Sequence, residues 1–151
     1  MKIYAKTKQH FDGREEYYHK LPLPSQVKRL GKYLKDNLTG VYKVQEPPNE
    51  YIIYTTLLYQ VPAELRQKMK QYKELKGVEE DIYEANVYFN ITTYGEYIRV
   101  NIILLDEYEV TLGYLRFEHK DLISLPACKQ KLLDFTFKKI TKYFDKYEVL
   151  I

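Results

Sequence analysis

Apolar and polar side chains alternate most regularly on either side of a single glycine, Gly95. The segment Tyr94-Gly95-Glu96-Tyr97 is typical of a two-residue type II′ turn, in which glycine takes the first central position. Such a turn fixes a register with four cross-strand pairs, nearly all apolar, on one face: Val87–Leu104, Phe89–Ile102, Ile91–Val100 and Thr93–Ile98. A slip of one residue would scatter these side chains over both faces, so the pattern specifies the register.

Four other segments are predicted to be strands. The first, Lys2–Ala5, leads into an irregular arm that ends near Lys20. Val41–Gln45 and Glu50–Tyr59 follow, separated by a diproline turn, because proline cannot donate to a β-ladder. The last strand, Val110–Glu118, comes after the hairpin and a short acidic turn.

The strand after the hairpin is expected to extend the same apolar face with Thr111, Gly113, Leu115 and Phe117. Gly113 would lie opposite Ile102. Its missing side chain predicts that a helix packs closely at this point.

Three segments have apolar residues at helical spacing. Helix one is predicted over Ser25–Leu38, with Ser25 as its N-cap and Gly40 ending it. Helix two begins near Pro62 and stops at Gly77. The last helix begins at Ser124 and Pro126, with Ser124 as its cap, and its apolar stripe is Leu125, Cys128, Leu132, Leu133, Phe137, Ile140, Phe144 and Tyr147.

Together these segments predict a single α+β domain over residues 1–151, in the order β-α-β-β-α-β-β-β-α, with residues 1–20 as the N-terminal strand and arm. The three amphipathic helices need an apolar surface to cover, and the antiparallel sheet offers one. After the first strand, the order αββαβββα resembles that of the roadblock and longin-like families of small interaction modules. The likeness is one of topology, without a shared motif, and a Lys-rich second helix and the N-terminal arm depart from it.

Length and cysteine content narrow the class of protein. A chain of 151 residues buries roughly 70% of its unfolded surface and needs no staple. The single cysteine, Cys128, excludes an internal disulfide and is expected to be a buried, inert thiol. The N-terminus lacks a signal-peptide pattern, and the longest central apolar run, Ile102–Leu105, is too short for a membrane span. We expect a soluble cytoplasmic protein, with the nucleus as the alternative, and no membrane partner.

Charge is unevenly distributed along the chain. Residues 79–109 contain eight acidic side chains and one basic side chain, Arg99, and therefore carry a net charge of −7. Because the whole chain carries +3, the remainder carries +10. We expect an acidic region and a basic region on the folded molecule, and solvated loops and helix faces account for most such charge runs.

The polar side of the predicted hairpin is the candidate binding surface. Tyrosine offers flat amphipathic area, and asparagine and arginine offer directed hydrogen bonds, a mixture typical of binding patches. The alternative is an ordinary solvated sheet face, or one covered by the N-terminal arm. The candidate residues are Tyr88, Asn90, Arg99, Asn101, Tyr114 and Arg116, with Thr92, Ile103 and Leu112 on the same face.

We expect the partner of this surface to be another protein, which makes the chain a non-catalytic interaction module or complex subunit. The tyrosines would act as anchors, or an exposed strand edge would accept a further strand. A second copy of the chain is also compatible. The alternative partner is nucleic acid, bound by the basic face of helix one through Lys28, Arg29, Lys32 and Lys35, or by the lysines of the last helix.

Catalytic signatures are absent from the sequence. The histidines His10, His19 and His119 are too scattered for a metal-ligand pair, and one cysteine cannot build a zinc site. We therefore expect no metal, no cofactor and no enzymatic activity. The remaining catalytic hypothesis is a hydrolase or transferase that uses the carboxylates of the acidic turns, namely Glu79, Glu80, Asp81, Asp106, Glu107 and Glu109.

Overall fold

The computed structural model describes residues 21–66 and 82–145 of the chain. The predicted strand Lys2–Ala5, the N-terminal arm and most of the predicted second helix lie outside the described residues. Residues 63–66 are helical, which agrees with the predicted start of that helix near Pro62. The fold is mixed α+β, and the order of its described elements is the predicted one.

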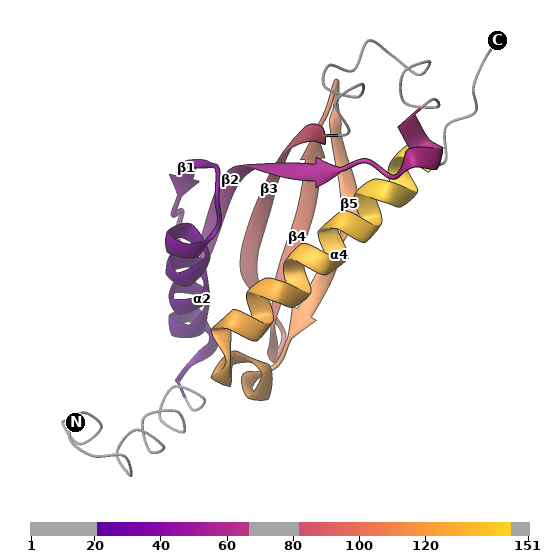
Figure 1. The fold of residues 1–151 in the computed structure, drawn as a ribbon. Helices are drawn as coiled ribbons and strands as arrows, with labels where there is room; N and C mark the ends of the chain where they lie inside the picture. The colour runs from indigo at the N-terminus through magenta and orange to yellow at the C-terminus, as the bar shows by residue number, and fades with distance from the viewer. Residues whose placement is uncertain (1–20, 67–81, 146–151) are drawn as a thin grey trace.

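The centre of the fold is an antiparallel sheet of five strands in the order β1-β2-β3-β4-β5, so that each strand pairs with its neighbours in the sequence (Figure 1). Its strands are β1 (Val41–Gln45), β2 (Glu50–Gln60), β3 (Ile82–Tyr94), β4 (Tyr97–Leu105) and β5 (Glu109–Phe117). The predicted strands agree with these bounds to within one residue for β1, β2 and β5. Because the order is a simple meander, β1 and β5 are the two edges of the sheet that the described residues form.

The β3–β4 hairpin has the predicted register. Val87, Phe89, Ile91 and Thr93 pair with Leu104, Ile102, Val100 and Ile98, respectively. Gly95 has a φ of 63°, and Glu96 does not have a positive φ. Since a type I′ turn would need positive φ at both central residues, the turn is type II′ as predicted.

Strand β5 departs from the predicted pattern at one point. A β-bulge at Leu112 shifts the register between the pairs Ile102–Gly113 and Ile103–Thr111. The bulge adds one residue to β5, so Val110 pairs with Leu104 on the core side and Thr111 moves to the other face. The prediction that Thr111 continues the apolar face was therefore wrong, whereas Leu115 and Phe117 lie on that face as predicted.

Two long helices, α2 (Leu23–Asn37) and α4 (Leu125–Asp145), lie side by side across the same face of the sheet (Figure 1). A short 3-10 helix, η3 (His119–Ile123), joins β5 to α4. The predicted stripe of α2 is confirmed, because its apolar residues are buried against the sheet: Val27, Leu30, Leu34 and Leu38. These contacts make the layer between helices and strands the hydrophobic core.

The beginnings of the two helices show one wrong prediction and one confirmed prediction. Helix α2 starts two residues before Ser25, with Pro22 in the cap position, so Ser25 lies in the first turn and is not the N-cap. Proline near a helix start is favourable, since its ring already has a helical φ and the first N–H groups lack intrahelical partners. Ser124 does cap α4, because its Oγ accepts a hydrogen bond from the Ala127 N–H at 3.3 Å.

Helix α4 packs on the sheet with the predicted residues and with others that the predicted stripe did not include. Cys128, Leu132, Ile140 and Phe144 are buried as expected, and Tyr147 lies outside the described residues. Phe135, which falls outside the predicted stripe, lies over Gly113, where an added Cβ would be 3.3 Å from the ring. The prediction that Gly113 admits a closely packed helix is thus confirmed.

A second close approach links α2 to the sheet. Gly31 is buried in the middle of α2, and a Cβ added there would overlap the ring carbons of Tyr51 in β2. In an ordinary exposed helix, replacing glycine by alanine stabilises by about 0.5–1 kcal/mol. At Gly31 the aromatic ring should reverse the sign of this effect.

We predict that Gly31→Ala lowers the free energy of unfolding by about 1–3 kcal/mol, because the added methyl group overpacks a filled site. Urea denaturation followed by circular dichroism measures the change. Lys32→Ala, on the exposed side of the same helix, is the matched control and should change stability by less than about 0.5 kcal/mol. Equal or greater stability of Gly31→Ala would show that the helix and Tyr51 are not in close contact.

Candidate functional site: the open face of the sheet

The sheet has a second face that no described helix covers. Side chains alternate between the two faces of a strand, and on β2 and β3 the odd-numbered residues are buried under α2 and α4. The even-numbered residues of these strands point the other way, as do the odd-numbered residues of β4. We call this surface the open face, and its polar and aromatic residues include Tyr42, Lys43, Glu50, Tyr54, Tyr88, Asn90, Tyr94, Tyr97, Arg99, Asn101, Tyr114 and Arg116.

All six residues predicted as the binding patch lie on the open face. Asn90 pairs with Asn101, and Asn101 pairs with Tyr114 on the next strand. Arg99 pairs with Arg116 in the neighbouring row, and Tyr88 pairs with Ile103. The register therefore places the six side chains on one face of three neighbouring strands, β3, β4 and β5.

Two arginines directly opposite each other on neighbouring strands would repel, unless their surroundings compensate for the charge. The Arg99 guanidinium lies between two tyrosine rings, 4.9 Å from the ring centre of Tyr94 and 4.0 Å from that of Tyr114. Its Nε donates to Asn101 Oδ1 at 3.2 Å. Cation–π contacts of this kind stabilise by about 0.5–2 kcal/mol each, depending on how dry the site is.

Arg116 is compensated by a carboxylate. Its guanidinium lies 4.1 Å from the ring centre of Tyr97 and forms an ion pair with Glu118 at 3.0 Å. Glu118 also caps η3, since its side chain accepts from the backbone N–H of Asp121. Arg99, in contrast, faces no carboxylate among the described residues. The two arginines are therefore not equivalent, and Arg99 is the one without a carboxylate partner among the described residues.

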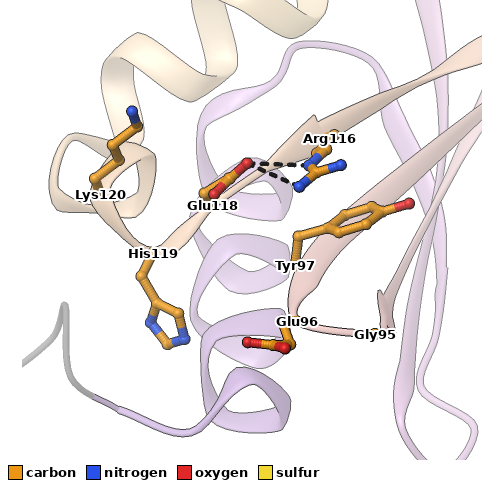
Figure 2. Close-up of a pocket in the computed structure, with 7 residues that line it drawn as sticks. All are labelled: Gly95, Glu96, Tyr97, Arg116, Glu118, His119 and Lys120. Carbon is orange, nitrogen blue, oxygen red and sulfur yellow. Dashed lines mark hydrogen bonds and ion pairs between the residues drawn. The ribbon is translucent and has the colours of Figure 1, made fainter.

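A hollow of about 700 Å³ adjoins the open face where the β3–β4 turn approaches the end of β5 (Figure 2). Its lining residues come from the turn, the end of β5 and the start of η3: Gly95, Glu96, Tyr97, Arg116, Glu118, His119 and Lys120. The sequence analysis did not predict this hollow, because it forms only when η3 turns back beside the hairpin. Its acidic and basic side chains are present in similar numbers, and Figure 2 shows Arg116 and Glu118 already joined.

A row of tyrosines crosses the other half of the open face. The ring centres of Tyr42 and Tyr54 are 6.2 Å apart, and those of Tyr54 and Tyr88 are 5.0 Å apart. The Tyr88 hydroxyl donates to Glu109 Oε1 at 3.2 Å. Burial raises the pKa of Tyr88 above its ordinary value, and the hydrogen bond to Glu109 and its charge raise this pKa further. Tyr88 therefore stays neutral and serves as a packing and hydrogen-bonding group.

Sequence reasoning missed part of this surface and misplaced two of its members. Tyr42 and Tyr54 belong to β1 and β2, and only the β2–β3 register brings them beside Tyr88. The alternation within β2 was the available signal, since Ile53, Thr55 and Leu57 are buried on the other side. Two residues expected on the open face are less available than predicted: Ile103 is buried, and the bulge residue Leu112 packs against the core.

The basic residues of the nucleic-acid hypothesis lie on the opposite side of the molecule. Lys28, Lys32 and Lys35 are exposed in a single row on α2, and Arg29 is half-buried, with its Nη1 donating to Gln26 at 2.7 Å. Helix α2 covers the core side of the sheet, so these cations are separated from the tyrosines of the open face by the sheet itself. The structure does not bring stacking rings and this row of lysines together.

The acidic residues of the catalytic hypothesis do not form one cluster in the part of the chain that the structure describes. Glu79, Glu80 and Asp81 lie outside the described residues. Asp106 accepts a hydrogen bond from the Tyr143 hydroxyl at 2.9 Å, and Glu109 accepts from Tyr88. Residues 21–66 and 82–145 contain no group of three or more potential metal ligands. Neither of their long helices has an apolar stretch sufficient to cross a bilayer.

Comparison with protein-family models, curated proteins and solved structures produced no match to this chain. The resemblance in element order to the roadblock and longin-like families thus receives no further support.

The contact that holds Arg99 against the Tyr114 ring can be tested by mutagenesis. In a double-mutant cycle of Arg99→Ala and Tyr114→Ala, we predict a coupling energy of about 0.5–1 kcal/mol, because the two side chains are in direct contact. Urea denaturation of the wild type, both single variants and the double variant measures it. A cycle of Arg99→Ala with Tyr108→Ala, a tyrosine exposed in the β4–β5 turn, should be additive. A coupling of zero for the first pair would mean that the ring does not hold the arginine.

Cys128 should be unreactive in the folded protein. Burial raises the pKa of its thiol from 9.0 to about 11, and the nearby Asp121 raises it as well. At a fixed pH below 9, iodoacetamide should react about 100-fold more slowly with the native protein than with the unfolded chain, because the thiolate is the nucleophile. Since the folded-state pKa is the higher one, the thiol's contribution to stability is complete below pH 9 and is lost as the pH approaches 11. Equal alkylation rates in the two states would contradict a buried thiol.

Proposed function

We propose that this chain is a non-catalytic protein-interaction module whose open face binds a partner protein. The observation that supports it best is the environment of Arg99, a half-buried guanidinium held between two tyrosine rings without a carboxylate partner among the described residues. A partner that supplies an acidic side chain at this point would complete the ion pair. The arginine would not need to reorganise, because the rings already fix its plane.

The tyrosines around Arg99 supply contact area. Tyr94 and Tyr114, which contact Arg99, are 55% and 48% exposed, and Tyr42 at the other end of the open face is 56% exposed. Tyrosine and arginine are enriched among the residues that contribute most to protein–protein affinity, since they bury much area with few rotatable bonds. A rigid sheet that presents both types is a suitable docking platform.

The charge of the open face favours a protein over nucleic acid. Its cations Lys43, Arg99 and Arg116 are accompanied by carboxylates on the same surface, and Glu50 accepts from Asn90 at 2.8 Å. A nucleic-acid surface usually presents an excess of cations, because each bound phosphate must be neutralised. Here the lysine rows lie on the helices instead, away from the tyrosines.

The test begins by capturing the partner at the surface in question. Tyr94 is replaced by a photo-crosslinking phenylalanine derivative in the cells that produce the protein, and the crosslinked protein is identified by mass spectrometry. Its affinity is then measured by calorimetry for the wild type and for Arg99→Ala/Tyr114→Ala. We predict about 10- to 100-fold weaker binding for this double variant, as expected for loss of a central arginine and tyrosine.

The matched control is Lys142→Ala/Tyr108→Ala, which also removes one cation and one exposed tyrosine but lies away from the open face. It should bind like the wild type. Arg99→Lys should lose most of the affinity too, because lysine keeps the charge but not the planar stacking. Equal affinity of the double variant and its control would refute the open face as the binding site. Crosslinks to nucleic acid, with binding that falls steeply as salt rises, would support the alternative partner instead.

A further inference from the structure

One edge of the sheet has no further strand beside it among the described residues. Strand β5 pairs with β4 alone, and among the described residues no backbone group of residues 109–117 takes part in hydrogen bonds outside the sheet. An edge strand presents alternate N–H and C=O groups outward, where an extended segment of another protein can pair with them. The bulge at Leu112 restricts regular geometry to residues 113–117, which pair with β4 without a shift.

An apolar groove runs beside this same part of the edge. It has a volume of about 570 Å³ and lies between β5 and the outer side of α4. Leu115, Phe135 and Ala127 contribute its apolar lining, and Phe135 reaches over the backbone at Gly113. A strand added to β5 would therefore direct every second side chain into the groove. One extended peptide segment could therefore pair with the β5 edge and fill the groove at the same time.

The charge around the groove indicates the chemistry of that ligand. Lys131 and Lys138 line it, against the single carboxylate of Asp134. Lys139 and Lys142 on α4 continue this excess. A partner with acidic residues is favoured at this site, because opposite charges assist association and like charges oppose it.

The same charges argue against a second copy of this chain as the occupant. Antiparallel pairing of two β5 edges would place the α4 helix of each copy on the same side of one extended sheet. Lys131 of each copy would then approach the seam between the copies, and like charges would oppose each other there. A heterologous acidic segment has no such difficulty.

We propose that the edge of β5 binds an extended segment of a partner protein by strand addition, and that apolar residues alternate with acidic residues in this segment. The apolar side chains enter the groove beside α4, and the acidic side chains lie on the opposite side of the added strand, along the open face beside Arg116. Lys131 and Lys138 flank the groove and attract the acidic segment through their charge. The segment spans about five residues, the length of regular edge next to the groove. This proposal can be tested separately from the open-face function, because strand pairing uses the backbone of β5 and the groove lies between β5 and α4.

The experiment uses a synthetic peptide in which valine and glutamate alternate, titrated into the isotope-labelled full chain. We expect saturable binding that weakens with salt, with amide shift changes and slowed hydrogen exchange concentrated in residues 113–117. Two matched peptides serve as controls. One carries N-methyl groups on alternate amides and cannot pair as a strand, and the other has lysine in place of glutamate; both should bind at least about tenfold more weakly.

Variants of α4 separate the groove from the open face. Ala127 is exposed, so Ala127→Arg should fill the groove without disturbing the core and should weaken binding although it adds a positive charge. Lys131→Glu should weaken binding about tenfold, while Lys142→Glu, the same charge reversal elsewhere on α4, should have a smaller effect. Equal binding of the N-methylated peptide, shift changes confined to Tyr94 and Arg99, or no saturable binding would each overturn the proposal. None of these results would change the binding expected for the open-face variant Arg99→Ala/Tyr114→Ala.

Discussion

The hydrophobic burial of one face of the sheet governs the rest of this structure. Side chains such as Phe89, Ile102 and Ile53 are completely buried between the strands and the two helices, and each such side chain contributes about 1.5–3 kcal/mol when buried. Because strand side chains alternate, this burial also determines which residues point away from the core. The composition of the open face is therefore a consequence of the register that fills the core.

The open face is stabilised by a different kind of interaction. Its strands carry two opposed arginines, which in isolation would weaken the pairing of β4 and β5. Stacking on Tyr94, Tyr97 and Tyr114, together with the Arg116–Glu118 ion pair, compensates for this repulsion. The tyrosines thus have a structural reason to be present as well as the proposed binding role, and both follow from the same contacts. A surface whose side chains are already held in place has less conformational entropy to lose when a partner binds.

The sequence was most informative where a local rule and a long-range pattern agreed. Around Gly95 the turn type and the alternation both point to one register, and the cross-strand neighbours of Arg99 and Asn101 followed from it. The bulge at Leu112 escaped prediction, because one added residue leaves the composition of a strand unchanged and is visible only against its partner. Tyr54 was missed for a related reason, since it reaches Tyr88 through a pairing between strands separated by a long connection. Ser25 was assigned to the wrong position because the preceding prolines allow α2 to begin earlier.

The simple strand order has a consequence for the way the chain reaches its native state. Every strand pairs with the strand that precedes or follows it, so the hairpin across Gly95 can close through a loop of two residues before any distant segment is in place. Strand β5 can then join β4 across another short connection. Pairing of β2 with β3 must close a loop over residues 61–81. Because a longer loop loses more chain entropy when it closes, this pairing should be slower than the formation of either short hairpin. The β1–β2 hairpin on one side and β3, β4 and β5 on the other can therefore form through short loops, and the joining of β2 to β3 is the step that loses the most chain entropy.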